Sequence, residues 1–312
     1  MKHWLQTLRH GAHTGAKKLS RKILHWRMRN RPQAEVLLAE RKLRGLEQYK
    51  KLRSADVVFV SFGKSGRTWL RVMVSHLFRI KHDLPENAIL SFDNFHNMEP
   101  AVPKTFFTHD NYIKDYTGEP DSKKPFYDKP VILLVRDPRD VAVSQFFQWK
   151  FRLKDSKVAL NNYPSREEDV SIFDFVMSDI GGGMLEVIQY MNVWAREVDN
   201  VERFHLVRYE DLRADSTGQL RGMLDFMGVN ATDEQVSAAV EYSSFENMKK
   251  MESQAQFRLA GGRMMPRDKD NPDSYKVRRA KVGGYRDYFS DEEVALINAR
   301  LRDTLDPYFN YV

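Results

Sequence analysis

A short turn near the start of the chain gathers groups that could bind an anion. Residues 61–70 read Ser-Phe-Gly-Lys-Ser-Gly-Arg-Thr-Trp-Leu. Lys64 offers a positive charge, and Ser65 and Thr68 offer hydroxyl groups. Gly66 lets backbone N–H groups approach a ligand without an intervening side chain. A helix that begins here would add unpaired N–H donors and the positive end of its dipole, so the turn predicts a phosphate-binding site.

The flanking residues predict which elements position this turn. Residues 57–60 (Val-Val-Phe-Val) are typical of a buried parallel strand, and the apolar residues of 70–78 have helical spacing. A nucleotide-triphosphate P-loop would need a glycine at position 58, where the chain has Val58. The turn therefore lies where a P-loop would lie, between a strand and a helix, but its sequence does not match the P-loop motif. An ordinary strand–turn–helix with an incidental lysine is the alternative.

Three later apolar runs also end in residues that could bind or react. They are residues 104–110, 131–135 and 204–209, with His109, Arg136 and Tyr209 at their ends. An arginine at the C-terminal end of a strand points into the crevice where open α/β sheets bind ligands. A lone histidine is more often structural than catalytic, so spacing alone gives His109 no role. Strands that alternate with helices predict one α/β domain whose central, mainly parallel sheet is flanked by helices.

Bulk composition narrows the class of protein. The chain has 312 residues and no cysteine, which excludes disulfides, cysteine nucleophiles and thiolate metal sites. No apolar run approaches the about 18 residues that a membrane span needs. We therefore expect a cytoplasmic protein. No cluster of aspartate and histidine has the spacing of metal ligands, so we expect no metal.

The positive charge lies in an N-terminal arm, residues 1–53, which precedes the domain expected at 54–312. The arm holds 15 Lys and Arg against 3 Glu, whereas the remainder of the chain has a net charge of −5. Apolar residues recur at helical spacing from Leu5 to Trp26, and a second helical stretch, residues 33–51, follows Pro32. Peripheral contact with an anionic membrane is one interpretation. A helix packed on the domain, a mitochondrial-type transit segment and a disordered tail are the others.

Several motifs together resemble one family. Residues 63–70 (Gly-Lys-Ser-Gly-Arg-Thr-Trp-Leu) are similar to the Pro-Lys-Ser-Gly-Thr-Thr-Trp-Leu loop of the sulfotransferases that use 3′-phosphoadenosine 5′-phosphosulfate (PAPS). Four further stretches match that family in order and spacing: residues 136–144, Tyr209-Glu210-Asp211, Ser243-Ser244-Phe245, and Arg278-Arg279-Ala280 with Gly283. The chain is thus identified as a cytosolic-type member, and we expect a bacterial one. The matches cover residues 57–290.

The resemblance implies which residues hold PAPS. Residues implied at the 5′-phosphosulfate are Lys64, Ser65, Gly66, Arg67 and Thr68. Residues implied at the 3′-phosphate are Arg136, Ser144, Arg278, Arg279 and Ala280. Residues implied at the adenine are Trp69, Tyr209, Ser243 and Phe245. Arginine suits the phosphate because its planar fork binds phosphate oxygens in pairs.

The resemblance also implies the reaction and its catalytic residues, His109, Lys64 and Ser144. His109 would take the proton of an acceptor hydroxyl as that oxygen attacks sulfur in line, and Lys64 would stabilise the departing oxygen. Two departures bear on the site. Phe107 stands where the family has a lysine, and we hypothesise that Arg67 supplies the missing charge. Ala280 replaces a glycine.

The acceptor is left open between a lipid, a glycoconjugate, a phenol, a steroid or another alcohol. A P-loop-type nucleotide-dependent phosphotransferase is one alternative function. The other is a non-enzymatic protein that binds membranes or nucleic acid through the basic arm. For the enzyme we expect no nucleic-acid partner, a cytoplasmic location with peripheral contact at the inner face of a membrane, and no sequence-specified oligomeric state.

Overall fold

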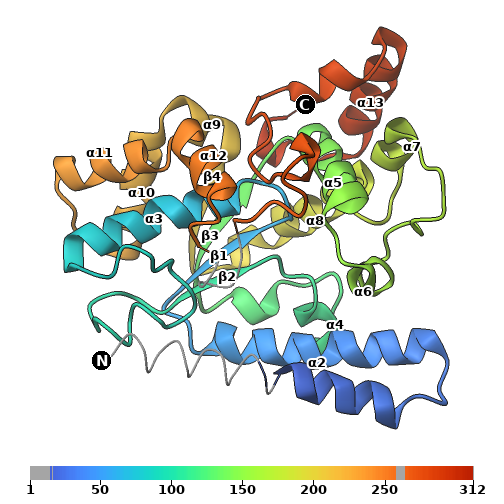
Figure 1. Ribbon diagram of the computed structural model, residues 1–312, viewed down its shortest axis with the longest axis horizontal. Coiled ribbons are helices and arrows are strands. Elements are labelled where there is room, and N and C mark those ends of the chain that lie inside the picture. Colours follow the sequence, from blue (N-terminus) through green and yellow to red (C-terminus); the bar gives the residue numbers. More distant parts are fainter. Residues whose placement is uncertain (1–14, 16, 258–263, 312) are drawn as a thin grey trace.

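A sheet of four parallel strands lies at the centre of the molecule, in the order β2-β1-β3-β4 (Figure 1). The computed structural model describes residue 15 and residues 17–257 and 264–311. The strands are β1 (Val57–Ser61), β2 (Thr105–Thr108), β3 (Pro130–Val135) and β4 (Arg203–Arg208). The predicted parallel α/β sheet is confirmed, and each predicted strand lies within a residue or two of its expected bounds.

Both faces of the two central strands, β1 and β3, are buried, which explains why these strands are almost continuously apolar. Val58 and Val60 belong to one core cluster, whereas Val57 and Phe59 belong to the other. This division follows from the two-residue period of a strand, which sends successive side chains to opposite faces. Each face therefore needs its own layer of helices.

Helices supply those two layers. On the side of Phe59, apolar residues come from α3 (Arg67–His82), α10 (Ser216–Met227) and α11 (Asp233–Tyr242). On the side of Val58, they come from α5 (Pro138–Phe151), α8 (Met184–Glu197) and α13 (Asp291–Thr304). From residue 33 onward, the other α-helices of the described ranges are α2 (Gln33–Arg53), α4 (Ile113–Thr117), α6 (Asp155–Val158), α7 (Ile172–Met177), α9 (Tyr209–Ala214) and α12 (Phe245–Ser253). Short 3-10 helices lie at Lys124–Phe126, Ala159–Asn161, Val198–Asn200, Pro272–Ser274, Gly284–Tyr288 and Pro307–Phe309.

Local sequence signals set the starts of several helices. Thr232 and Gln235 form a capping box at the start of α11, and Ser290 and Glu293 form another at α13. Each box satisfies backbone N–H groups that a helix end leaves without partners. Pro138 occupies the first turn of α5, where its missing N–H costs nothing.

Helix α2 packs on the domain beside α4, as one interpretation of the arm predicted (Figure 1). The Arg41 Nε donates to the Leu160 carbonyl at 2.7 Å, and Arg53 forms two hydrogen bonds to Asp128 at 2.7 and 2.8 Å. Gly45 is the point of closest approach, because a Cβ there would lie 2.1 Å from the Tyr112 carbonyl oxygen. The helix can therefore lie this close only with glycine at that position.

The Gly45→Ala variant should be destabilised, although alanine is usually the better helix former. We expect a loss of about 1–3 kcal/mol, because the added methyl group must push α2 away from α4. Gly222→Ala is the matched control, since its Cβ would meet only His205 at an ordinary 3.5 Å within α10. That variant should be stabilised by up to about 1 kcal/mol. Chemical denaturation measures both, and equal effects of the two changes would contradict the close packing.

Residues 17–27 form a second helix that faces α2 through charged groups. Arg21 pairs with Glu47 at 2.8 Å, and His25 contacts Glu40 at 2.7 Å. The first part of the predicted amphipathic helix, residues 1–14 and 16, lies outside the described residues. Among the residues that are described, none of the helices is both long and apolar enough to cross a membrane.

Candidate active site

One large cavity opens along the edge of the sheet where the four strands end. Its volume is about 1060 Å³. Because the strands are parallel, the residues that follow β1, β2, β3 and β4 all reach this edge. The cavity is lined by every predicted site residue except Ser65: Lys64, Gly66, Arg67, Thr68, Trp69, His109, Arg136, Ser144, Tyr209, Ser243, Phe245, Arg278, Arg279 and Ala280.

The turn between β1 and α3 needs a left-handed backbone. Lys64 has φ 73° and Gly66 has φ 100°. A Cβ at position 66 would lie 2.7 Å from the Tyr209 ring, so glycine is required there for space as well as for conformation. Ser65 is 2% exposed and does not line the cavity. Its predicted contribution to the anion site is thus limited to its backbone.

Gln145 fills the space beside Gly63, the position where the family has proline. A Cβ at position 63 would lie 2.6 Å from the Gln145 Nε2, which donates to the Gly63 carbonyl at 3.1 Å. The Tyr163 hydroxyl donates to the Gln145 Oε1 at 3.1 Å and so fixes the amide. Gln145 was not among the predicted site residues, because nothing in the local sequence pattern of α5 marks it.

Lys64 lies among other cations and is half-buried in the cavity wall. Burial, and then the charges of the neighbouring Arg152, Lys276 and Arg278, lower its pKa to about 7. Desolvation and like charges both favour the neutral amine. An anion bound beside it would favour the charged form, so ligand binding and protonation of Lys64 should be coupled.

Binding of a phosphosulfate analogue should therefore take up protons at pH 8. With the free pKa near 7, most Lys64 is neutral at that pH, and the bound anion raises its pKa; affinity should fall as pH rises from 7 to 9. Calorimetry in phosphate and Tris buffers, whose ionisation enthalpies differ, should give an uptake of about one proton. In Lys64→Arg the uptake should vanish. Buffer-independent enthalpies for the unaltered protein would contradict this coupling.

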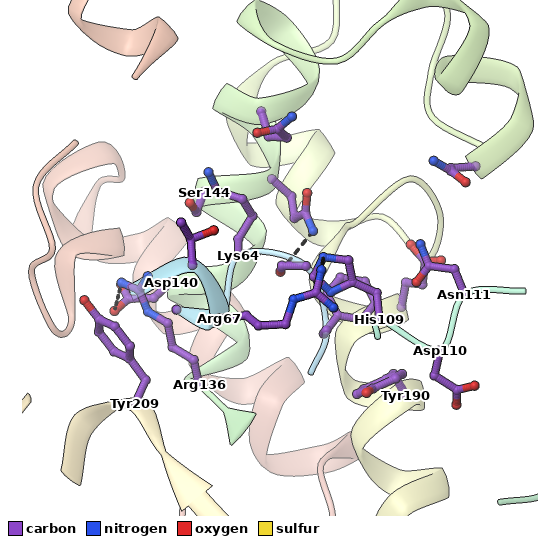
Figure 2. Close-up of a pocket in the computed structure, with 18 of the residues that line it drawn as sticks. Lys64, Arg67, His109, Asp110, Asn111, Arg136, Asp140, Ser144, Tyr190 and Tyr209 are labelled. Atoms are coloured by element: carbon purple, nitrogen blue, oxygen red, sulfur yellow. Dashed lines mark hydrogen bonds and ion pairs between the residues drawn. The ribbon is translucent and has the colours of Figure 1, made fainter. Parts of the chain in front are cut away.

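His109 is held in the tautomer that a general base needs. Its Nδ1 lies 2.8 Å from the Ser61 carbonyl oxygen, which can only accept, so Nδ1 carries the proton and Nε2 keeps its lone pair. That Nε2 accepts a hydrogen bond from the Arg67 guanidinium at 2.6 Å, as Figure 2 shows. Burial first, and Arg67 second, lower the pKa of His109 well below its usual value. The imidazole is therefore neutral at neutral pH.

Arg71 brings a further charge to the place where the family has a lysine. Phe107 stacks on Phe59 with ring centroids 4.8 Å apart, and the Arg71 guanidinium lies 4.1 Å from the Phe107 ring centre. Arg71 is 7% exposed and also lines the cavity. Sequence analysis missed it, although its position one helical turn after Arg67 was a usable signal. The hypothesis that Arg67 supplies this charge stays a prediction.

Asp140 joins the two segments that carry the predicted 3′-phosphate residues. It accepts a hydrogen bond from Arg136 at 3.2 Å (Figure 2), and it accepts the N–H groups of Gly283 at 3.0 Å and Tyr285 at 2.9 Å. The Arg136 guanidinium also lies 4.3 Å from the Tyr209 ring centre. These contacts position the start of α5 against the C-terminal basic loop.

The basic loop itself is held by acidic and aromatic neighbours. Arg278 lies 3.5 Å from the Phe147 ring centre and pairs with Asp273 at 3.0 Å. Arg279 is 53% exposed and pairs with Asp287. Ala280 has φ 51°, a left-handed conformation in which the family's glycine would be unstrained.

Glu252 anchors the loop just before Arg278. It is fully buried and accepts the backbone N–H groups of Lys276 at 2.7 Å and Val277 at 2.9 Å. Arg152 lies 3.4 Å from the same carboxylate and compensates its charge. A buried charge of this kind needs both a partner and hydrogen bonds, and Glu252 has both.

Aromatic residues lie between the two cationic regions. The Trp69 Nε1 donates to the Ser243 carbonyl at 2.8 Å, and its ring meets the Tyr209 ring edge-on at 5.8 Å. The Ser243 hydroxyl donates instead to the Ala239 carbonyl at 2.9 Å, so Ser243 acts on the cavity through its backbone. Phe245 lines the cavity as the first residue of α12. Within the described ranges, no three histidine, cysteine or acidic residues group closely enough to hold a metal ion.

This fold and site define a sulfotransferase domain. The chain belongs to the sulfotransferase domain family, whose sequence profile matches residues 54–307. It is 24% identical to cytosolic sulfotransferase 14 of Arabidopsis thaliana, over 80% of this chain and 75% of that protein. It is 25% identical to sulfotransferase 6B1 of Mus musculus, over 88% of this chain and 84% of that protein. The fold is similar to that of mouse sulfotransferase SULT7A1 complexed with PAP, with a TM-score of 0.51, 18% identity and coverage of 83% and 89%.

Family membership makes this protein a sulfotransferase, as the motifs predicted. It favours sulfuryl transfer over the two alternatives, a P-loop-type phosphotransferase and a non-enzymatic binding protein. The family match begins at residue 54 and so does not include α2.

Proposed function

We propose that this enzyme transfers the sulfuryl group of PAPS to a hydroxyl acceptor, with His109 as the general base. One observation supports this proposal most directly. The Ser61 carbonyl binds the His109 Nδ1, which leaves the lone pair on Nε2, and His109 lines the same cavity as the phosphate-binding turn. Lys64 and the turn amides would hold the 5′-phosphosulfate. Arg136, Ser144 and the basic loop from Arg278 to Ala280 would hold the 3′-phosphate, with adenine between Trp69 and Phe245.

The reaction then follows from the positions of these groups. The acceptor hydroxyl gives its proton to the His109 Nε2 while its oxygen bonds to sulfur in line with the bridging oxygen. The bond between sulfur and the bridging oxygen breaks, and Lys64 stabilises the charge that develops on that oxygen. The products are the sulfate ester and 3′-phosphoadenosine 5′-phosphate (PAP).

Arg67 must leave His109 before this transfer can occur. In the structure its guanidinium donates to the lone pair of the His109 Nε2 at 2.6 Å. The phosphosulfate offers a stronger partner, because hydrogen bonds to an ionised acceptor are shorter and stronger than those to a neutral imidazole. Donor binding would thus free the base and, at the same time, place Arg67 on the sulfuryl group.

Calorimetric titration with PAP, ATP and 5′-AMP tests the donor. We expect micromolar binding of PAP, about −8 kcal/mol, and much weaker binding of ATP. Arg136→Ala should lose PAP binding, whereas Arg300→Ala on α13, which does not line the cavity, should not. Preference for ATP, or no nucleotide binding, would overturn the proposal. Unchanged turnover after treatment with EDTA would support the proposed metal independence.

We also propose that residues 1–53 localise the enzyme at the inner face of an anionic membrane. Leu19, Ile23 and Trp26 are 58%, 42% and 66% exposed on the helix of residues 17–27, among basic side chains. Such a helix suits an anionic lipid surface. Co-sedimentation with phosphatidylglycerol vesicles should exceed that with phosphatidylcholine vesicles and fall in Trp26→Glu. Equal sedimentation with both lipids would count against it.

A further inference from the structure

The cavity continues beyond His109 into a second part that none of the predicted donor residues lines. We call this part the acceptor chamber. Its walls come from α2, from the segment after β2, from the segment after α6 and from α8. Residues that define it are Arg41, Asn111, Tyr112, Asn162, Glu186 and Gln189. Figure 2 shows Asn111 and Tyr190 on the His109 side of the site, away from Arg136 and Tyr209.

The walls of the acceptor chamber are fixed by hydrogen bonds within the protein. The Tyr112 hydroxyl donates to the Asn161 Oδ1 at 2.5 Å. Asp110 and Lys123 form a buried ion pair at 2.7 Å, with side chains 4% and 5% exposed. The Glu186 carboxylate accepts the Gly182 N–H at 2.6 Å. The chamber therefore has a defined shape before a ligand enters, which lowers the entropy cost of binding.

Three carboxamide side chains in the walls of the acceptor chamber are available to a ligand. Among the residues that the structure describes, the side chains of Asn111, Asn162 and Gln189 make no hydrogen bond to another residue, and all three are exposed in the cavity wall. Each amide group offers two N–H donors and a carbonyl acceptor. A hydroxyl group both donates and accepts, so a compound with several hydroxyls matches this set.

The chamber shows no excess of either charge. Four cations line it, Arg41, Lys42, Lys114 and Lys123, and four carboxylates line it, Asp110, Asp115, Asp121 and Glu186. An anionic or cationic acceptor would need an imbalance of the opposite sign, because unpaired charge is costly to desolvate. The balance favours a neutral acceptor.

Aromatic rings add apolar surface to this polar wall, since Phe62, Tyr112, Tyr163 and Tyr190 all line the cavity. Tyr190 is half-buried and meets Phe62 edge-to-face at 5.4 Å, which fixes its ring beside His109. Sugar rings combine hydroxyl groups at their rim with an apolar C–H face, and the Tyr190 ring offers its apolar face to such a surface while its hydroxyl oxygen stays buried. Leu38, Leu160 and Val193 also line the cavity, so its wall can meet the apolar face of a sugar as well as its hydroxyl groups.

We propose that the acceptor is a neutral, polyhydroxylated compound, a sugar or glycoside, in place of a phenol or a steroid. This inference rests on the proposed sulfuryl transfer and deepens it. A chamber built to hydrogen-bond hydroxyl groups rejects analogues that lack them, because its polar groups would then be left without partners. Helix α2 contributes Leu38, Arg41 and Lys42 to this wall and lies outside the family match, so acceptor selectivity is set partly by the N-terminal segment.

A competition among acceptors tests the substrate class. The full chain is supplied with [³⁵S]PAPS and two panels: neutral mono- and disaccharides with their methyl and octyl glycosides, and 1-naphthol, 4-nitrophenol and a 3-hydroxysteroid. We expect the best glycoside to have a kcat/KM at least about 100-fold above that of the best phenol or steroid. A phenol or steroid as the best substrate overturns the inference, as does micromolar PAP binding with no glycoside sulfated. Absence of PAP binding would instead overturn the proposed function.

Two variants of the acceptor chamber provide a second test of the inference. Asn111→Leu and Gln189→Leu should lower kcat/KM for glycosides by about 10- to 100-fold while PAP affinity stays unchanged. Turnover of phenols should be kept or raised. Asn230→Leu, an exposed asparagine away from the cavity, is the matched control. Equal loss for glycosides and phenols would mean that these amides support the fold and do not recognise the acceptor.

Discussion

Replacing His109 with asparagine should lower kcat by about 10²- to 10⁴-fold and leave PAP affinity within about twofold. Asparagine can still donate to the Ser61 carbonyl, but it offers no basic nitrogen at the position of Nε2. The lower kcat would therefore result from the loss of proton transfer and not from a change in the structure at the end of β2. Steady-state kinetics with calorimetry of PAP binding separates the two.

The pH profile gives an independent measure of the same group. Because burial and Arg67 lower the pKa of His109 well below its usual value, kcat/KM for the acceptor, measured at saturating PAPS so that Lys64 is already charged, should stay flat as pH falls from 8 through 6.5 and should drop only at lower pH. His82→Asn is the control, since His82 ends α3 and does not line the cavity. Full activity in His109→Asn would assign the general base to another residue.

Replacing Lys64 with methionine should lower kcat/KM by about 10²- to 10³-fold, the usual cost of removing one preorganised charge from a transition state. Methionine keeps most of the length and the apolar stem of lysine, so the left-handed turn at φ 73° stays occupied by a similar side chain. The effect should appear in both kcat and PAP affinity, because the lysine meets the donor before and during transfer.

A conservative variant and a surface variant serve as controls for the Lys64→Met substitution. Lys64→Arg should recover part of the loss by restoring the charge, whereas Lys249→Met on exposed α12 surface should have no effect. If Lys64→Met changed PAP affinity alone and left kcat intact, Lys64 would bind the donor without acting on the departing oxygen. Arg67 or Arg71 would then be the remaining cations of the turn to examine.

The sequence was enough to predict the donor half of the cavity because each of its parts follows a strand. His109, Arg136 and Tyr209 each come directly after an apolar run. Parallel strands end at one edge of a sheet, so short local patterns were sufficient to bring these residues together. The phosphate-binding turn could be predicted for a similar reason, since its strand, its two glycines and its helix are contiguous in the chain.

The acceptor half could not be predicted in this way. Arg41, Asn111, Asn162 and Gln189 come from four segments with no common periodicity, and their meeting depends on how loops and α2 pack. Gln145 was missed because its role is to fill the space beside Gly63, which only the packed structure reveals. Pairwise packing between distant segments leaves no signature in a single sequence.

The contact between Arg67 and His109 bears on how the enzyme treats water. Activated sulfate is unstable toward hydrolysis wherever a base can deprotonate a water molecule close to sulfur. Whenever Arg67 holds the His109 Nε2 lone pair at 2.6 Å, the imidazole cannot activate water, and in the donor complex this protection lasts for as long as Arg67 has not moved to the sulfuryl group. If Arg67 alternates between the imidazole and the sulfuryl group, sulfate release without acceptor should be slow in the unaltered protein and faster in Arg67→Ala, as ion chromatography would measure. Equal release rates would exclude this protection, and a slow rate would mean that one arginine keeps the activated donor for the acceptor.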